Sequence, residues 1–199
     1  MADVPEAAVD RRLARGEETR RRLAEAMIAL LEDGSAQPAA REIAERAGVS
    51  LRLVFHHFED MEQLLRSAVA VQVERHWSRL RPVDPGLPRA ERIDRIIRQR
   101  ENLYEAIAPV RRAAARMEDG SPTLTAELDH ARTELRYGLK ACFASETAGD
   151  PTLIDALEIA TSWETWEQLR RRMALGRAAA RKVMVRIVES LLGDPGGKA

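Results

Sequence analysis

The chain of 199 residues lacks the features that mark several protein classes. Its single cysteine, Cys142, excludes an intramolecular disulfide and leaves a cysteine-based zinc site dependent on histidines. The longest uninterrupted apolar stretch, from Ala26 to Leu31, is far below the roughly 20 residues that a membrane-spanning helix needs. The N-terminus carries acidic residues where a signal peptide has basic ones, so export is not expected. These absences predict a cytoplasmic protein with no membrane partner.

Lysine is also scarce, and the positive charge comes almost entirely from arginine. The formal net charge is zero, so bulk charge does not indicate a nucleic-acid-binding protein. Residues 1–60 contain nine arginines and twelve acidic residues. Nucleic-acid binding would therefore depend on where individual side chains lie.

Proline and glycine interrupt the sequence at intervals, and the segments between them follow the helical period. In the N-terminal part we expect a helix capped by Thr19 and ended by Gly34, and a short helix from Pro38 to Ala47. A third helix, capped by Ser50, should run to about His57. The sequence Asp-Met-Glu-Gln at 60–63 resembles a capping box and predicts the start of a fourth.

A cluster of three prolines and a glycine at 82–88 marks a boundary. Beyond it, Ser121-Pro122 and Asp150-Pro151 each predict a helix start, the second leading a helix to Arg172, and a last helix should span Arg177–Leu192. No segment alternates as a strand would. The sequence predicts an all-α protein of about nine helices, in a small N-terminal unit and a larger C-terminal one.

Residues 39–58 are the most informative segment. Two helices of about two turns are joined by a turn that contains Gly48, and Ile43, Ala47 and Val54 can meet in one core. This is the arrangement of a helix-turn-helix, in which the second helix lies in the DNA major groove. From spacing alone, an ordinary helical hairpin remains the alternative.

The surrounding sequence favours the first interpretation. Glu17 to Leu65 resembles the DNA-binding domain of the tetracycline-repressor-like (TetR) family. The matching features are Thr-Arg-Arg-Arg-Leu-Ala-Glu-Ala-Met-Ile-Ala-Leu-Leu, Arg-Glu-Ile-Ala-Glu-Arg-Ala-Gly-Val-Ser, and Phe-His-His-Phe followed by Glu62 and Leu64-Leu65. The resemblance implies an N-terminal helix-turn-helix domain, segment 11–60, a connecting helix, 61–81, and a helical ligand-binding and dimerisation domain, 88–193. This last domain matches in architecture only.

Residues that would contact DNA are expected on and near the second helix of the motif: Arg41, Ser50, Leu51, Arg52, Phe55 and His56. Arg52 can pair bidentately with guanine. The segment departs from the family pattern at positions that usually supply hydroxyls or lysines to the DNA backbone, namely Pro38, Ala39, Leu51, Arg52, Leu53, Phe55 and Met61. Since such contacts supply much of the affinity, we expect a smaller charge contribution to DNA binding.

Six arginines between Arg11 and Arg22 could form an arm against DNA or simply a solvated helix face. His56 should point outward and His57 partly into the core, which does not suit a metal pair because helical ligands are spaced three or four residues apart. No metal or cofactor is expected.

The resemblance also implies a small-molecule cavity in the larger domain. Candidate lining residues are Asn102, Tyr104, Met117, His130, Tyr137, Trp163 and Trp166, although a globular domain normally uses such residues as core. The helix Arg177–Leu192 carries an apolar stripe that would suit a homodimer interface or internal core. The expected interface residues are Trp166, Val183, Ile187 and Leu191.

Together these observations predict a homodimeric, ligand-responsive transcriptional regulator, a repressor that a small apolar or aromatic effector releases from palindromic double-stranded DNA. Enzyme motifs such as Gly-x-Ser-x-Gly are absent from the sequence, so catalysis is not expected. The alternative is a helical small-molecule-binding or interaction protein whose DNA affinity is weak or lost.

Overall fold

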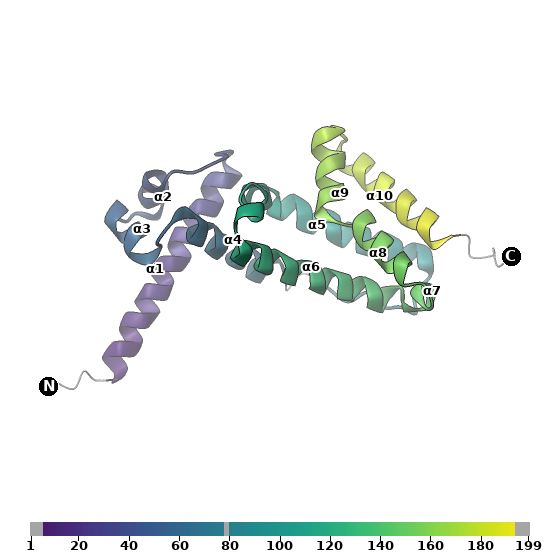
Figure 1. Ribbon diagram of the computed structural model, residues 1–199, viewed down its shortest axis with the longest axis horizontal. Coiled ribbons are helices and arrows are strands. Elements are labelled where there is room, and N and C mark those ends of the chain that lie inside the picture. The colour runs from purple at the N-terminus through teal and green to yellow at the C-terminus, as the bar shows by residue number, and fades with distance from the viewer. Residues whose placement is uncertain (1–5, 78–79, 194–199) are drawn as a thin grey trace. The chain divides into compact units, whose positions relative to one another are not determined.

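The computed structural model describes residues 6–77 and 80–193, with the side chains of residues 6–12 and 119 excluded. Every element within these ranges is helical and no strand occurs there, which confirms the all-α prediction (Figure 1). No helix in the described ranges combines the length and apolar character needed to cross a bilayer. The helices form two compact units, one made of α1 to α4 with Ile107–Leu128, the other of 80–106 with 129–193.

The first unit opens with four helices: α1 (Glu6–Glu32), α2 (Ala40–Ala47), α3 (Leu51–His57) and α4 (Met61–Trp77). Helix α1 begins earlier than predicted. The hydroxyl of Thr19 donates to the carbonyl of Arg15 at 2.8 Å inside the helix, so Thr19 is not its cap. Alanine, arginine and glutamate, which favour helices, dominate the residues before it and allow the helix to extend. Gly34 follows the end of α1 with a φ of 98°, as predicted.

The expected start of α2 at Pro38 is also wrong by two residues. Helix α2 begins at Ala40, with Ala39 as its N-cap and Pro38 buried before it. The carboxylate of Glu42 accepts a hydrogen bond from the backbone N–H of Ala39 at 2.7 Å, half of a capping box. This bond sets the start of the helix at a residue that has no side-chain acceptor of its own.

The core of the first unit contains the residues that the helical period placed inward. Ile43, Ala44 and Ala47 of α2 and Val54 of α3 are buried. The other helices of the unit contribute Leu23, Met27, Leu64, Leu65, Ala68, Val110, Ala114 and Leu124 to the same cluster. The shared core makes α2 and α3 parts of one packed body.

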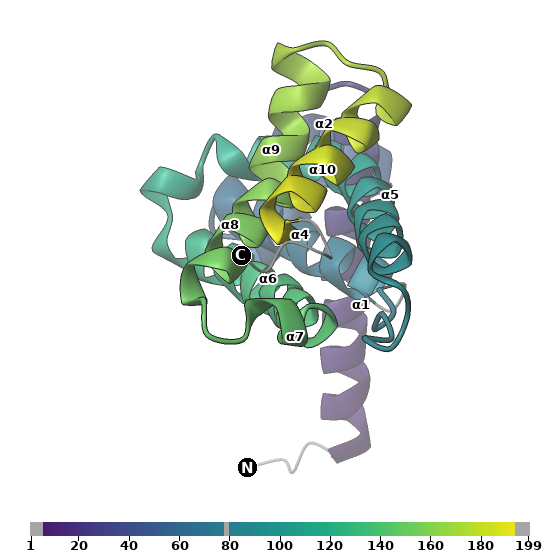
Figure 2. The same cartoon turned by 90° about the vertical axis from the view of Figure 1, so that its right-hand side faces the viewer.

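Helix α5 (Arg89–Ala115) and α6 (Pro122–Cys142) contribute residues to both units, and the 3₁₀ turn η1 (Glu118–Gly120) lies between them in sequence. The second unit continues with α7 (Ala144–Thr147), α8 (Pro151–Ala160), α9 (Trp163–Glu167), the π-helical turn η2 (Gln168–Arg172) and α10 (Arg177–Leu192). The predicted caps are confirmed, because Ser121 and Asp150 accept hydrogen bonds from backbone N–H groups of the following turn. Helices α8 and α10 lie side by side in both views (Figures 1 and 2).

The single helix expected from Pro151 to Arg172 is interrupted. The carbonyl of Thr161, which a continuous helix would use internally, accepts a hydrogen bond from the buried hydroxyl of Tyr104 at 2.8 Å. The hydroxyl of Ser162 then caps α9 by accepting from the N–H of Thr165 at 3.1 Å. A contact from α5, distant in sequence, thus accompanies the break.

A buried ion pair ties α5 to α7 within the second unit. Arg92 donates to the Glu146 carboxylate, at 3.1 Å from its Nη1, and also to the carbonyls of Leu87 and Cys142 at 3.0 and 2.7 Å. The side chains of Arg92 and Glu146 are only 7% and 16% exposed. The hydrogen bonds from Arg92 lower the pKa of Glu146 to about 2, against an ordinary value of 4.5.

We expect Glu146→Gln to lower the free energy of unfolding at neutral pH by about 2 kcal/mol, since it removes a charge-assisted bond to a buried guanidinium. Because the pKa of Glu146 lies below its ordinary value, the stabilisation is complete above pH 4.5 and disappears as the pH falls towards 2. Urea unfolding at neutral and acid pH measures both effects. Glu134→Gln, at an exposed position on α6, is the control. Equal stability of both variants at neutral pH would contradict the role of the pair.

Candidate nucleic-acid interface

The turn between α2 and α3 has the geometry that its sequence predicts. Gly48 adopts a left-handed conformation, with φ 66° and ψ 38°, which a residue with a side chain would adopt only with strain. The hydroxyl of Ser50 accepts a hydrogen bond from the N–H of Leu53 at 3.3 Å and so caps α3. Helix α3 therefore starts at Leu51 and ends at His57, as predicted.

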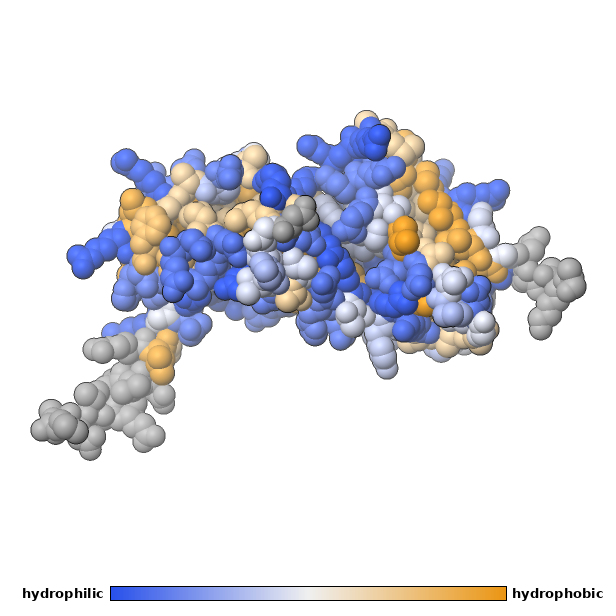
Figure 3. All heavy atoms as spheres, in the orientation of Figure 1, coloured by the Kyte–Doolittle hydropathy of each residue, from blue (hydrophilic) through white to orange (hydrophobic). Residues whose placement is uncertain are grey.

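The outer face of α3 carries most of the residues that were expected to contact DNA. Leu51 and Phe55 are 42% and 55% exposed, and Arg52 and His56 are exposed beside them. Figure 3 shows the apolar atoms of this face at the surface over α3. Five of the six expected residues, Ser50 included, thus lie on one short helix and its cap, while Val54 on the opposite face is buried.

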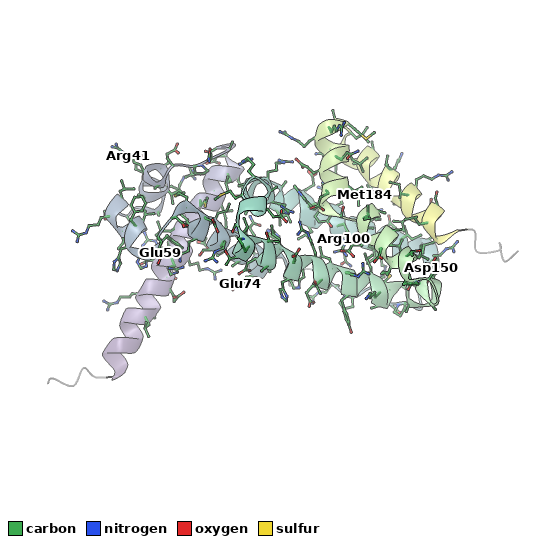
Figure 4. All side chains as sticks on the ribbon, in the orientation of Figure 1. Arg41, Glu59, Glu74, Arg100, Asp150 and Met184 are labelled. Carbon is green, nitrogen blue, oxygen red and sulfur yellow. The ribbon has the colours of Figure 1, made fainter. Side chains whose placement is uncertain are left out.

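The sixth residue, Arg41, lies on α2 and is exposed (Figure 4). Its Nε lies 3.2 Å from the carboxylate of Glu45, one turn further along the same helix. Such an exposed pair is weak, so Arg41 remains available for another partner.

The arginines of α1 have a role that sequence reasoning did not find. Arg22 donates from Nη2 to the carbonyl of Ala47, the last residue of α2, at 2.6 Å. Arg20 donates to the carbonyl of His57, the last residue of α3, and its guanidinium lies 4.4 Å from the centre of the Phe58 ring. Arg21 pairs with Glu74 of α4 at 2.9 Å. These three side chains bind within the unit, while those of Arg11 and Arg12 lie outside the described residues.

These contacts matter because the last carbonyls of a helix have no partner inside it and carry a partial negative charge. A cation from α1 at each of these ends satisfies one such carbonyl and holds α2 and α3 in place. The partners are 25 and 37 residues apart in sequence, so no local pattern could have indicated them.

His57 is partly buried and His56 is exposed, as expected. Burial lowers the pKa of His57, and the neighbouring charges of His56 and Arg20 lower it further. Within the described ranges, no group of three His, Cys, Asp or Glu side chains could hold a metal ion.

The residues expected to line a small-molecule site are distributed over several environments. Tyr104 and Trp163 are buried and pack edge to face with their ring centres 5.8 Å apart. Trp166 is also buried and donates from Nε1 to Glu105 at 3.0 Å. Met117 packs against the core of the first unit, and the remaining candidates, Asn102, His130 and Tyr137, are exposed. Only the three buried aromatic residues share the interior of the second unit.

Helix α10 divides its apolar residues between two environments. Ala180, Met184 and Val188 are buried, while Val183, Ile187 and Leu191 are only half-buried and form an apolar strip at the surface (Figure 3). Trp166, which was expected to share that interface, is 1% exposed and therefore already covered by its own chain.

Comparison with known proteins agrees with this geometry. Residues 23–68 match the model of the bacterial regulatory proteins of the tetR family. The chain carries a TetR-family N-terminal domain. The matched segment contains α2, α3 and the buried residues that connect them to α1 and α4. No curated protein matches the chain.

Solved structures extend the likeness to most of the chain. A transcriptional regulator from Rhodococcus sp. Rha1 is 24% identical, with a TM-score of 0.70 over 87% of this chain and 95% of that one. A tetR-family transcriptional regulator from Streptomyces coelicolor is 20% identical, with a TM-score of 0.70 over 88% of this chain and 80% of that one. The all-helical fold is therefore that of TetR-family regulators.

Removing the α1 contact to α2 should destabilise the N-terminal domain. We expect Arg22→Met to lower the free energy of unfolding by about 1–3 kcal/mol, since a charged hydrogen bond to a helix end is lost while the apolar part of the side chain is kept. Chemical unfolding followed by circular dichroism measures this loss. The control is Arg15→Met, also on α1 and exposed. The assigned role would be wrong if both variants were equally stable.

Proposed function

We propose that the protein is a homodimeric transcriptional repressor, which a small apolar or aromatic effector releases from a palindromic DNA operator. The observation that carries this proposal is the exposure of the outer face of α3, the second helix of a helix-turn-helix that matches the TetR family. In such motifs the second helix enters the major groove. A helix that presents Leu51, Arg52, Phe55 and His56 outward offers the groove both polar and apolar contacts.

The chemistry of that face favours base contacts over backbone contacts. Arg52 can donate two hydrogen bonds to guanine O6 and N7, and an apolar side chain such as Phe55 can pack against a thymine methyl group. Leu51, Leu53 and Phe55 carry no hydroxyl or charge for a phosphate. We therefore expect DNA binding to depend less on salt than that of a typical relative.

A gel-shift assay with the DNA that flanks the protein's own gene, at two salt concentrations, tests the proposal. A saturable complex that survives competition by unrelated DNA is the expected result. Absence of a complex at both concentrations would reject the regulator and favour the alternative, a helical small-molecule-binding protein without DNA affinity.

Replacing Arg52 tests its role in reading bases. We expect Arg52→Ala to weaken binding to the cognate site by about 1–3 kcal/mol and to change binding to random DNA little. Fluorescence anisotropy with both DNA types measures the two losses. Arg98→Ala, at an exposed position of the second unit, is the control. Equal losses on cognate and random DNA would make Arg52 a phosphate contact.

The homodimer is supported by the apolar strip on α10. One chain covers Ala180, Met184 and Val188 but leaves Val183, Ile187 and Leu191 half-buried. Side chains of this kind gain about 25 cal/mol for each Å² of apolar surface removed from water. A second copy that brings the same strip against the first would bury this face by a self-complementary contact.

We expect Ile187→Asp to give a folded monomer that no longer binds a palindromic operator, because the dimer would bury an unpaired charge. Light scattering, circular dichroism and a gel shift together measure assembly, folding and binding. Lys182→Asp places the same charge at an exposed position of α10 and should remain dimeric. Unfolding of Ile187→Asp would place the residue in internal core, and an intact dimer would place the interface elsewhere.

A further inference from the structure

Helix α5 carries three buried arginines, and one of them differs from the other two in its hydrogen-bond partner. Arg92, Arg100 and Arg111 are 6%, 5% and 7% exposed. Arg92 pairs with Glu146, and Nη1 of Arg111 lies 3.0 Å from the carboxylate of Glu118. Arg100 has no carboxylate within ion-pair distance among the residues that the structure describes. Arg100 instead donates from Nη2 to the backbone carbonyl of Leu135 on α6, at 2.8 Å.

One hydrogen bond to a carbonyl offsets little of the free-energy cost of burying a guanidinium. This group has five N–H donors and keeps its charge at every physiological pH. Buried charges in proteins are normally paired. Burial lowers the pKa of Arg100, and electrostatic interactions with Tyr104 and Glu158 oppose this. Glu158 itself, like Asp155, binds Arg136. Arg100 therefore lacks a counter-ion of its own.

The helical turn that follows Arg100 carries a buried aromatic side chain. Tyr104 lies one helical turn further along α5 and is buried, and its ring packs against Trp163 of α9. The tyrosine hydroxyl donates a hydrogen bond to the carbonyl of Thr161. Figure 4 marks Arg100 on α5, within the second unit.

We propose that Arg100 binds the anionic group of the effector, and that the effector is an organic anion with an apolar or aromatic body. A carboxylate matches the planar guanidinium and can accept two parallel hydrogen bonds from it. Tyr104 and Trp163 would then face the apolar body, as aromatic side chains do in small-molecule sites. This inference rests on the proposed ligand response, and it narrows the effector to an acidic compound.

The first test needs no ligand and compares two arginines of the same helix. Methionine keeps much of the length of the side chain and removes the charge. We expect Arg100→Met to unfold at a temperature equal to or higher than that of the unaltered protein, because an unpaired buried charge is lost. Arg92→Met should unfold several degrees lower, because it leaves Glu146 without its partner. A loss for Arg100→Met as large as that for Arg92→Met would make Arg100 a structural residue and overturn the proposal.

The second test measures the unfolding temperature with three carboxylates, benzoate, 1-naphthoate and octanoate, and with the corresponding neutral amides. At millimolar concentration we expect at least one carboxylate to raise the unfolding temperature of the unaltered protein by a few degrees more than its amide. Arg100→Met should lose this difference, and Arg92→Met should keep it. The proposal is overturned if no carboxylate exceeds its amide, or if Arg100→Met responds as the unaltered protein does.

A DNA-binding measurement separates this inference from the proposed function. Arg100→Met should bind operator DNA as the unaltered protein does but should no longer be released by the active carboxylate. A chain that binds no DNA but shows the Arg100-dependent thermal response would reject the repressor and keep the anion site. A chain that binds DNA but shows no such response would keep the regulator and reject the anion site.

Discussion

The helix-turn-helix depends on two hydrogen bonds from α1 to the ends of the helices that it supports. Arg22 satisfies the last carbonyl of α2, and Arg20 satisfies that of α3. Both bonds join a cation to the negative end of a helix, where the interaction is most favourable. Because α2 and α3 are only eight and seven residues long, they have little stability of their own, and these contacts together with the shared core set their positions.

In this arrangement the side chains on the outer face of α3 are exposed and do not contribute to the core of the unit. Its inward side, Val54, is buried, and its cap is supplied by Ser50. Arginines of α1 that would otherwise be candidates for DNA contact are used for internal bonds instead, and the exposed arginines that we propose for DNA contact are Arg52 on α3 and Arg41 on α2. A zero net charge is compatible with the proposed nucleic-acid interface, because such contacts depend on the positions of individual side chains and not on an excess of charge.

In the second unit, too, charged side chains form contacts between helices. Arg92 pairs with Glu146 of α7, and Glu101 pairs with Arg177 and Arg181 of α10. Pairs of this kind connect α5 to α7 and to α10 and define how the helices of the unit pack. Arg100 differs from these neighbours, because its acceptor is a backbone carbonyl and not a carboxylate.

The sequence by itself determined the helical class, the extent of α3 and α10, the caps at Ser50, Ser121 and Asp150, and the buried face of α2. These follow from local rules, since period, capping residues and glycine conformation depend on residues within a few positions of one another. Only the tertiary structure decided where the long-range partners lie. The break before α9 coincides with a bond from Tyr104, and the internal use of Arg20 and Arg22 depends on helix ends that lie dozens of residues away. Contacts between distant residues leave no local pattern, and for the same reason the missing counter-ion of Arg100 became visible only once the chain was folded.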